Sequence, residues 1–174
     1  HFGYNAAGLR FVRRERAEFR LGLGDELRVF LFRREFLIGA ADHRVRQAEG
    51  DLDAAVEGPM ASKYPNAGQT CVCVNRSRVQ DSVYDAFAAK LAEKVRGFKV
   101  GGGTESGVVI GPLIDEQGMK KVEKHVADAL DKGAKVVLGG KRHEKGGLFF
   151  QPTVLTNVTP EMLVSYEETF GPVA

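Results

Sequence analysis

The chain has 174 residues, of which 43% are hydrophobic and 28% charged, with 21 Gly, 2 Cys and no Trp. This composition supports one hydrophobic core, or at most two small ones, and excludes collagen-like, disulfide-scaffold and intrinsically disordered proteins. The net charge is +2, but residues 1–50 hold ten Arg, seven acids and no Lys, whereas residues 51–174 hold four Arg, eleven Lys and sixteen acids. Two parts of one natural domain rarely differ in this way.

The first fifty residues show no clean helical or strand period, and we assign no element there. From residue 51 on, hydrophobic pattern, caps and turns agree with one another. Asp51 or Asp53 can cap a helix that runs towards Lys63 and is broken at 65–68. The alternation that follows predicts a strand over Cys71–Val79.

A second helix is predicted to begin at Asp81 and end at Gly97. One apolar stripe follows its length: Val83, Phe87, Leu91 and Val95. A glycine-rich connection, residues 101–112, leads to a third helix between Asp115 and Gly133. Its expected buried face comprises Met119, Val122, Val126, Ala129 and Leu130.

Two extended stretches complete the chain. Residues 134–138 predict a short buried strand, and residues 148–158 predict an edge or bent strand because Pro152 interrupts them. Helices that alternate with short apolar strands indicate an α/β fold, with layered helices on a mainly parallel sheet. The segment 167–172 is turn-like.

The segment from Asn66 to Cys73 carries the clearest chemistry. Cys71 directly follows a turn containing Gly68, where backbone N–H groups can lower a thiol pKa or hold an oxyanion. A small buried cysteine is the more common situation, so the residues by themselves leave both readings open.

Five segments resemble the aldehyde dehydrogenase superfamily. Gly68-Gln69-Thr70-Cys71 matches its nucleophile motif, and the segment 51–58 looks like the helix before it. The others, called landmark segments below, are residues 111–114, 150–153 and 167–172. The Thr-Cys-Val-Cys and Glu-Glu-Thr-Phe-Gly-Pro variants are most similar to the succinate-semialdehyde dehydrogenase branch. The resemblance covers about residues 51–174 and implies part of the catalytic, C-terminal domain.

The resemblance implies NAD(P)⁺-dependent oxidation of an aldehyde, most similar to that of succinate semialdehyde to succinate. Cys71 would be the nucleophile: its thiolate adds to the carbonyl to give a thiohemiacetal, hydride passes to NAD or NADP, and water hydrolyses the remaining thioester. The Cys71 N–H would form half of the oxyanion hole. Glu168 would bind the nicotinamide ribose and Phe170 would pack beside the nicotinamide, although a solvated turn acid is the simpler reading of Glu168 by itself.

Cys73 is a candidate redox partner of Cys71. Residues i and i+2 of a strand point to opposite faces, so a Cys71–Cys73 disulfide would be strained and readily reduced. We therefore hypothesise reversible oxidative inactivation, with a packed small hydrophobe as the equal alternative. The cysteines and the scattered histidines lack zinc-ligand spacing, so no metal site is predicted.

Residues that the family mechanism needs are not recognisable here. They are the Rossmann-type cofactor domain, the general-base Glu of a Glu-Leu-Gly-Gly motif and the oxyanion-hole Asn. We therefore expect a piece of a longer homo-oligomeric enzyme, inactive by itself; the alternative is a non-catalytic interaction or structural module. Expected partners are a small aldehyde, with neither nucleic acid nor membrane. The expected location is the cytoplasm, or the mitochondrial matrix in a eukaryote, because a reduced compartment suits two closely spaced cysteines.

The change in charge composition coincides with the start of the resemblance near residue 51. We interpret residues 1–50 as an atypical Arg-rich segment that is poorly ordered and either translated from a shifted reading frame or otherwise not native. The alternative is a real but unrelated N-terminal segment. Suitable codons for residues 39–46, read one base later, would give the apolar strand ending in Val-Phe-Asp that the family places before this helix. The gene sequence tests this idea, which fails if no alternative frame restores Glu-Leu-Gly-Gly upstream.

Overall fold

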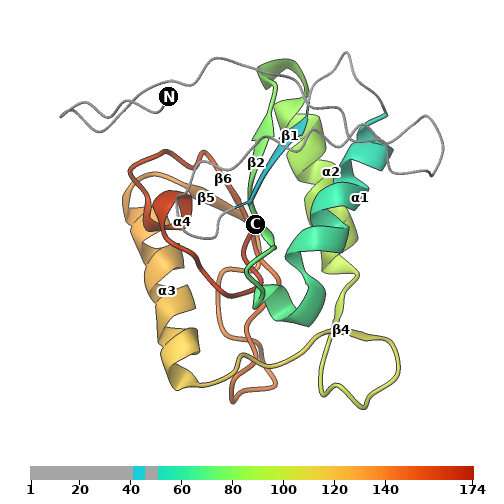
Figure 1. The fold of residues 1–174 in the computed structure, drawn as a ribbon, viewed down its shortest axis with the longest axis vertical. Coiled ribbons are helices and arrows are strands. Elements are labelled where there is room, and N and C mark those ends of the chain that lie inside the picture. Colours follow the sequence, from blue (N-terminus) through green and yellow to red (C-terminus); the bar gives the residue numbers. More distant parts are fainter. Residues whose placement is uncertain (1–40, 46–50) are drawn as a thin grey trace, which may run out of the picture. The chain divides into compact units, whose positions relative to one another are not determined.

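The computed structural model describes residues 41–45 and 51–174, and Figure 1 shows their arrangement. The first strand, β1 (Ala41–Val45), pairs in parallel with β2 (Val74–Val79). Between them runs α1 (Leu52–Lys63), whose N-cap Asp51 accepts a hydrogen bond from the backbone N–H of Asp53 at 2.8 Å. The helix expected from Asp51 is therefore confirmed, and β1 is a strand that the sequence pattern did not predict. Apart from residues 41–45, the N-terminal segment that was expected to be poorly ordered lies outside the described ranges.

The second helix begins later than its sequence predicts. A short 3-10 turn, η3 (Asp81–Val83), precedes α2 (Tyr84–Arg96), so Asp81 lies inside the turn and does not cap the helix. The four residues of the predicted stripe are nonetheless all buried. Three of them, Phe87, Leu91 and Val95, pack with α1 residues and with Val100, Ile110 and Val154 in one of two hydrophobic clusters.

The glycine-rich connection contains two strands that the sequence analysis missed. These are β3 (Lys99–Val100) and β4 (Val108–Ile110), which pair in parallel. After them comes α3 (Glu116–Asp131), capped by Asp115, whose carboxylate accepts from the Gly118 N–H at 2.7 Å. Its buried face differs from the predicted one in two residues: His125 belongs to it, and Leu130 is 45% exposed. Gly133 ends the turn with a φ of +99°.

The last strands form an antiparallel pair, β5 (Lys135–Leu138) with β6 (Val154–Thr156). The prediction of a buried strand here is wrong, because β5 alternates exposed and half-buried residues and is covered on one face only. The second hydrophobic cluster joins α3 to the C-terminal part of the chain, including Phe150, Met162 and Val173. A single turn of helix, α4 (Leu163–Tyr166), leads into the segment 167–172.

The described part of the chain is therefore α/β, as predicted, with two of its three strand pairs parallel. The strands form separate two-stranded sheets within these residues and do not join into one. Figure 1 shows α1 and α2 together on one side of β5 and β6, and α3 on the other. The two hydrophobic clusters lie on these two sides.

Candidate active site

The backbone that leads to Cys71 is strained. Asn66, Ala67 and Gly68 all have positive φ angles, of 51°, 54° and 72°. Left-handed conformations cost little for Gly but of order 1 kcal/mol or more for a residue with a side chain, and such strain concentrates at functional sites. The segment that the sequence marks as a turn is therefore held in a conformation that its own residues do not prefer.

Cys71 lies in a tight turn and not in a strand, so the strand predicted from residue 71 is wrong at its start. The Cys73 N–H donates to the Thr70 carbonyl at 3.3 Å, which makes Cys71 and Val72 the two central residues of the turn. The strand begins only at Val74, and Cys71 is exposed. A thiol on the outside of a turn can be reached by a substrate carbonyl, which a strand residue facing a core could not.

Cys73 is buried, and it is a free thiol like Cys71. Its sulfur lies 2.7 Å from the Thr70 hydroxyl and 3.5 Å from the Lys63 carbonyl oxygen. The two cysteines thus face different surroundings, as expected, but the turn causes this difference and not the alternation of a strand. The argument from strand alternation does not apply, and the proposed disulfide has to be judged from this turn.

Gln69 ties the nucleophile segment to the landmark segment 111–114. Its side-chain amide donates to the Pro112 carbonyl at 3.2 Å, and its carbonyl oxygen accepts from the Ile114 N–H at 2.8 Å. A third hydrogen bond, to the Asn66 carbonyl at 3.1 Å, closes the strained turn. A glutamine supplies both donor and acceptor, which explains why this residue type precedes Thr70-Cys71.

The segment 167–172 lies against the same turn. A Cβ atom on Gly68 would overlap the Gly171 carbonyl oxygen and lie 3.1 Å from that of Lys63, so only glycine allows this close approach. Within the segment, Phe170 has a φ of +48° and is 36% exposed. A bulky aromatic residue rarely adopts this conformation, so the packing around it must impose it.

Glu168 is half-buried, and its Oε1 atom is buried without a hydrogen-bond partner among the described residues. A buried carboxylate oxygen that accepts no hydrogen bond raises the free energy of the folded chain. Such atoms commonly bind a ligand, a water or another chain segment. The structure therefore places all four candidate residues, Cys71, Cys73, Glu168 and Phe170, on the two segments that meet at Gly68.

Two buried polar residues of this region were missed by the sequence analysis. Lys63, at the end of α1, is 0% exposed and donates through Nζ to the Asn75 Oδ1 at 2.7 Å. Burial lowers the pKa of Lys63 to about 8, against the opposing effect of nearby Cys73 and Glu168. A signal existed, because Lys63 follows the buried Val56 and Pro59 of α1 at helical spacing.

His125 of α3 is the second missed residue. It is 0% exposed and links α3 to the segment 167–172, with Nδ1 3.1 Å from Thr169 Oγ1 and Nε2 3.3 Å from Glu167 Oε2. Burial lowers the pKa of His125, although the bond to Glu167 acts in the opposite direction. Its place between Val122 and Val126 on the apolar stripe was the readable signal.

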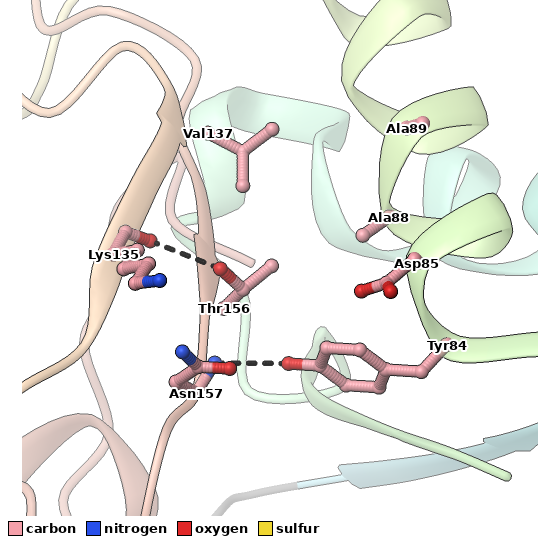
Figure 2. Close-up of a pocket in the computed structure, with 8 residues that line it drawn as sticks. All are labelled: Tyr84, Asp85, Ala88, Ala89, Lys135, Val137, Thr156 and Asn157. Atoms are coloured by element: carbon pink, nitrogen blue, oxygen red, sulfur yellow. Dashed lines mark hydrogen bonds between the residues drawn. The ribbon is translucent and has the colours of Figure 1, made fainter. Parts of the chain in front are cut away.

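A separate hollow lies between α2 and the β5–β6 pair, as Figure 2 shows. Two hydrogen bonds cross or flank it: the Asn157 N–H donates to the Tyr84 hydroxyl at 2.9 Å, and Thr156 Oγ1 donates to the Lys135 carbonyl at 3.5 Å. None of the four candidate residues lines this hollow. In the part of the chain that the structure describes, no group of His, Cys, Asp and Glu could hold a metal ion, and no helix could cross a membrane.

The sequence from residue 33 to residue 174 matches the profile of a known family, described as "Aldehyde dehydrogenase family". This chain belongs to the aldehyde dehydrogenase family. The resemblance stated from the motifs is therefore confirmed. The family match begins at residue 33, so it takes in residues 33–50, which the motifs had left outside.

Individual aldehyde dehydrogenases match closely over part of their length. An NADP(+) succinate-semialdehyde dehydrogenase of Escherichia coli K12 is 62% identical over 126 residues, and the 3-sulfolactaldehyde dehydrogenase of Pseudomonas putida is 59% identical over 126 residues. Each match covers 72% of this chain and 26% of the relative. The crystal structure of succinate-semialdehyde dehydrogenase from Burkholderia pseudomallei has a TM-score of 0.76 at 62% identity, over 78% of this chain and 28% of that one. The chain thus spans about a quarter of these aldehyde dehydrogenases.

Proposed function

We propose that Cys71 is the nucleophile of an NAD(P)⁺-dependent aldehyde dehydrogenase and that this chain carries the nucleophile part of its catalytic domain. The observation that carries the proposal is the position of Cys71, exposed at the centre of a tight turn that strained backbone and Gln69 hold in place. Such an arrangement presents the sulfur while fixing the chain on both sides of it, which is what a nucleophile requires.

The Cys71 sulfur would add to the aldehyde carbon, and the carbonyl oxygen of the thiohemiacetal would face the N–H groups of the turn. In the described residues the Cys71 N–H donates to no backbone carbonyl, so it is available for that oxygen. Loss of hydride from the thiohemiacetal leaves a thioester on Cys71. Addition of water then releases the acid and regenerates the thiol.

Glu168 and Phe170 would hold the cofactor. The free Oε1 of Glu168 fits a ligand that brings hydroxyl donors, and a ribose offers two adjacent ones. The partly exposed ring of Phe170 offers an apolar surface for a flat ring. NAD⁺ or NADP⁺, when bound, supplies the hydride acceptor; the choice between them lies outside these residues.

For the substrate we propose succinate semialdehyde. Two relatives at 62% and 59% identity are named for succinate semialdehyde and for 3-sulfolactaldehyde, which are both short aldehydes with an anionic group at the far end. Because the two names differ at nearly equal identity, the shared residues support the class of anionic short aldehydes more strongly than either member of it. We further propose that the complete enzyme is a homo-oligomer located in the cytoplasm, or in the mitochondrial matrix of a eukaryote.

The alternative to this proposal is a part of the family fold that has no catalytic role. In that case the chain is a non-catalytic interaction module that associates with full-length subunits. Thiol reactivity distinguishes the two, since an interaction module has no use for an accessible and selectively reactive Cys71.

The test measures the rate of iodoacetamide alkylation of Cys71 in the chain, with and without succinate semialdehyde. Reversible addition to the aldehyde does not need a cofactor, so the aldehyde should slow the alkylation, whereas butanal at the same concentration should slow it less. Cys71→Ser should remove the fast labelling, and Cys73→Ala should keep it. Alkylation that both aldehydes leave unchanged would instead support the interaction module.

A further inference from the structure

Lys63 is a basic residue in a buried position, where desolvation raises the free energy of a charged group. It is the last residue of α1, and no part of its side chain is exposed. An ammonium group has three N–H donors, and in the described residues Nζ makes one hydrogen bond, to Asn75 Oδ1. A buried ammonium normally needs an opposite charge nearby, because desolvation otherwise favours its neutral form.

The fold brings such a charge to Lys63. Gly68 packs between the Lys63 carbonyl and the Gly171 carbonyl, so the end of α1 and the segment 167–172 meet backbone to backbone. A second link ties them, since the Tyr64 hydroxyl donates to the Thr153 carbonyl at 3.1 Å and the Thr153 N–H donates to the Pro172 carbonyl at 2.8 Å.

Burial lowers the pKa of Lys63, and the Cys73 sulfur and the Glu168 carboxylate, which can both be negative, oppose this lowering. Cys73 already has the Thr70 hydroxyl and the Lys63 carbonyl as hydrogen-bond partners. Glu168 has a buried Oε1 without one, and it forms no direct ion pair with Lys63 within 4.0 Å in the described residues. Lys63 Nζ thus keeps N–H donors without a described acceptor and Glu168 Oε1 has no described donor, on two chain segments that meet at Gly68.

We propose that Lys63 is the positioning residue of Glu168: its buried ammonium attracts the carboxylate to the side of the Cys71 turn and leaves Oε1 free to accept from a cofactor hydroxyl. The second half of this statement rests on the proposed function, and the first half does not. An exposed glutamate would sample many rotamers, whereas one attracted to a buried charge is held before its ligand arrives.

The first test uses the titration of Lys63 itself, followed through its side-chain nitrogen and Cε resonances in lysine-labelled chain. Glu168→Gln removes a negative charge, so it should lower the Lys63 pKa from about 8 by roughly half a pH unit or more. Glu167→Gln is the matched control: it removes the neighbouring carboxylate, which bonds His125, and should leave the Lys63 titration unchanged. Equal effects of both variants, or no effect of Glu168→Gln, would overturn the proposal.

The second test measures binding of NAD⁺ and NADP⁺ to the chain by amide chemical-shift titration. Lys63→Met keeps the length of the side chain without its charge and should weaken binding about tenfold, the worth of one good hydrogen bond, while Lys63→Arg should weaken it less. Lys63→Met in the Glu168→Gln background should cause no further loss. Lys141→Met, at an exposed lysine, is the control, and thermal unfolding of each variant separates lost positioning from lost folding.

The two tests fail separately. If the parent chain binds neither cofactor, the proposed cofactor site of this chain is wrong, while the Lys63 titration still decides whether Lys63 and Glu168 interact. If the parent chain binds and Lys63→Met binds equally well, the positioning role is wrong although the cofactor site stands.

Discussion

At the scale of single residues, burial separates two cysteines that the sequence presents as a pair. Cys71 is exposed on its turn, and Cys73 is enclosed beneath it with Thr70 and the end of α1. The motif was enough to single out Cys71. The burial of Cys73 follows from the turn, which ends one residue before β2 begins.

The redox hypothesis for these cysteines remains a prediction. Under native conditions iodoacetamide should label Cys71 well before Cys73. Mild hydrogen peroxide should abolish that labelling while the intact mass falls by two hydrogens, because two thiols reduce the peroxide to water and form one disulfide. Dithiothreitol should restore it.

The control for this experiment is Cys73→Ala, in which peroxide can only add oxygen to Cys71 and the mass should rise. Labelling of the parent chain that peroxide leaves unchanged would contradict the switch.

Gly68 should be the least replaceable glycine near the site. Gly68→Ala places a Cβ against the Gly171 carbonyl at a φ of +72°, so we expect a loss of about 2–4 kcal/mol in the free energy of unfolding, measured with urea. Gly103→Ala is the control, because a Cβ there meets nothing within 4 Å, and it should change stability by less than about 0.5 kcal/mol. Equal stability of the two variants would contradict the close approach of the two segments.

At the scale of elements, helices were easier to predict than strands. The boundaries of α1 and α3 follow from capping aspartates that the sequence displays, and both caps form as expected. Strands β3 and β4 have two and three residues, too few for a period to be recognised, and their pairing depends on each other.

The link between α3 and the segment 167–172 should make stability depend on pH. Burial keeps the His125 pKa below its usual 6.5, with Lys121 and Lys124 acting in the same direction and Glu167 in the opposite one. The unfolded chain then binds a proton more readily than the folded chain. The contribution of His125 is therefore full above pH 6.5 and is lost as the pH falls from there towards the folded-state pKa.

Urea unfolding between pH 7.5 and 5.5 measures this loss, whose slope cannot exceed about 1.4 kcal/mol per pH unit for one group. His125→Gln should flatten the profile over this range. His143→Gln should keep the slope of the parent chain, and a parent profile that is already flat would show that His125 does not titrate as its burial implies.

At the scale of the whole molecule, the chain divides after Arg34, and Glu35–Ala174 forms a unit of its own. The family match begins almost at the same place, at residue 33. The shifted-frame interpretation of residues 1–50 stays a hypothesis for the gene sequence to decide. Residues 41–45, in the sequence without any change of frame, form strand β1, which pairs with β2 at five positions.

Truncation tests this division. A chain of residues 35–174 should unfold within about 3 °C of the full chain and keep its rate of Cys71 alkylation, because it retains every described element. A chain that begins at Asp51 loses β1 and leaves β2 without a partner strand, so its unfolding temperature should fall by at least about 5 °C. Comparable losses in both truncations would mean that residues 1–34 contribute to the fold.

The sequence by itself determined the family, the candidate nucleophile and the ends of α1 and α3, because these depend on residues close together in the chain: a short motif, a cap and a turn. Only the tertiary structure decided what surrounds Cys71. Lys63, His125 and Glu168 lie far apart in sequence, and helical spacing could have indicated the burial of the first two but not their neighbours. The close approach at Gly68 brings the end of α1, with the buried Lys63, against the segment that carries Glu168, and His125 holds that segment to α3.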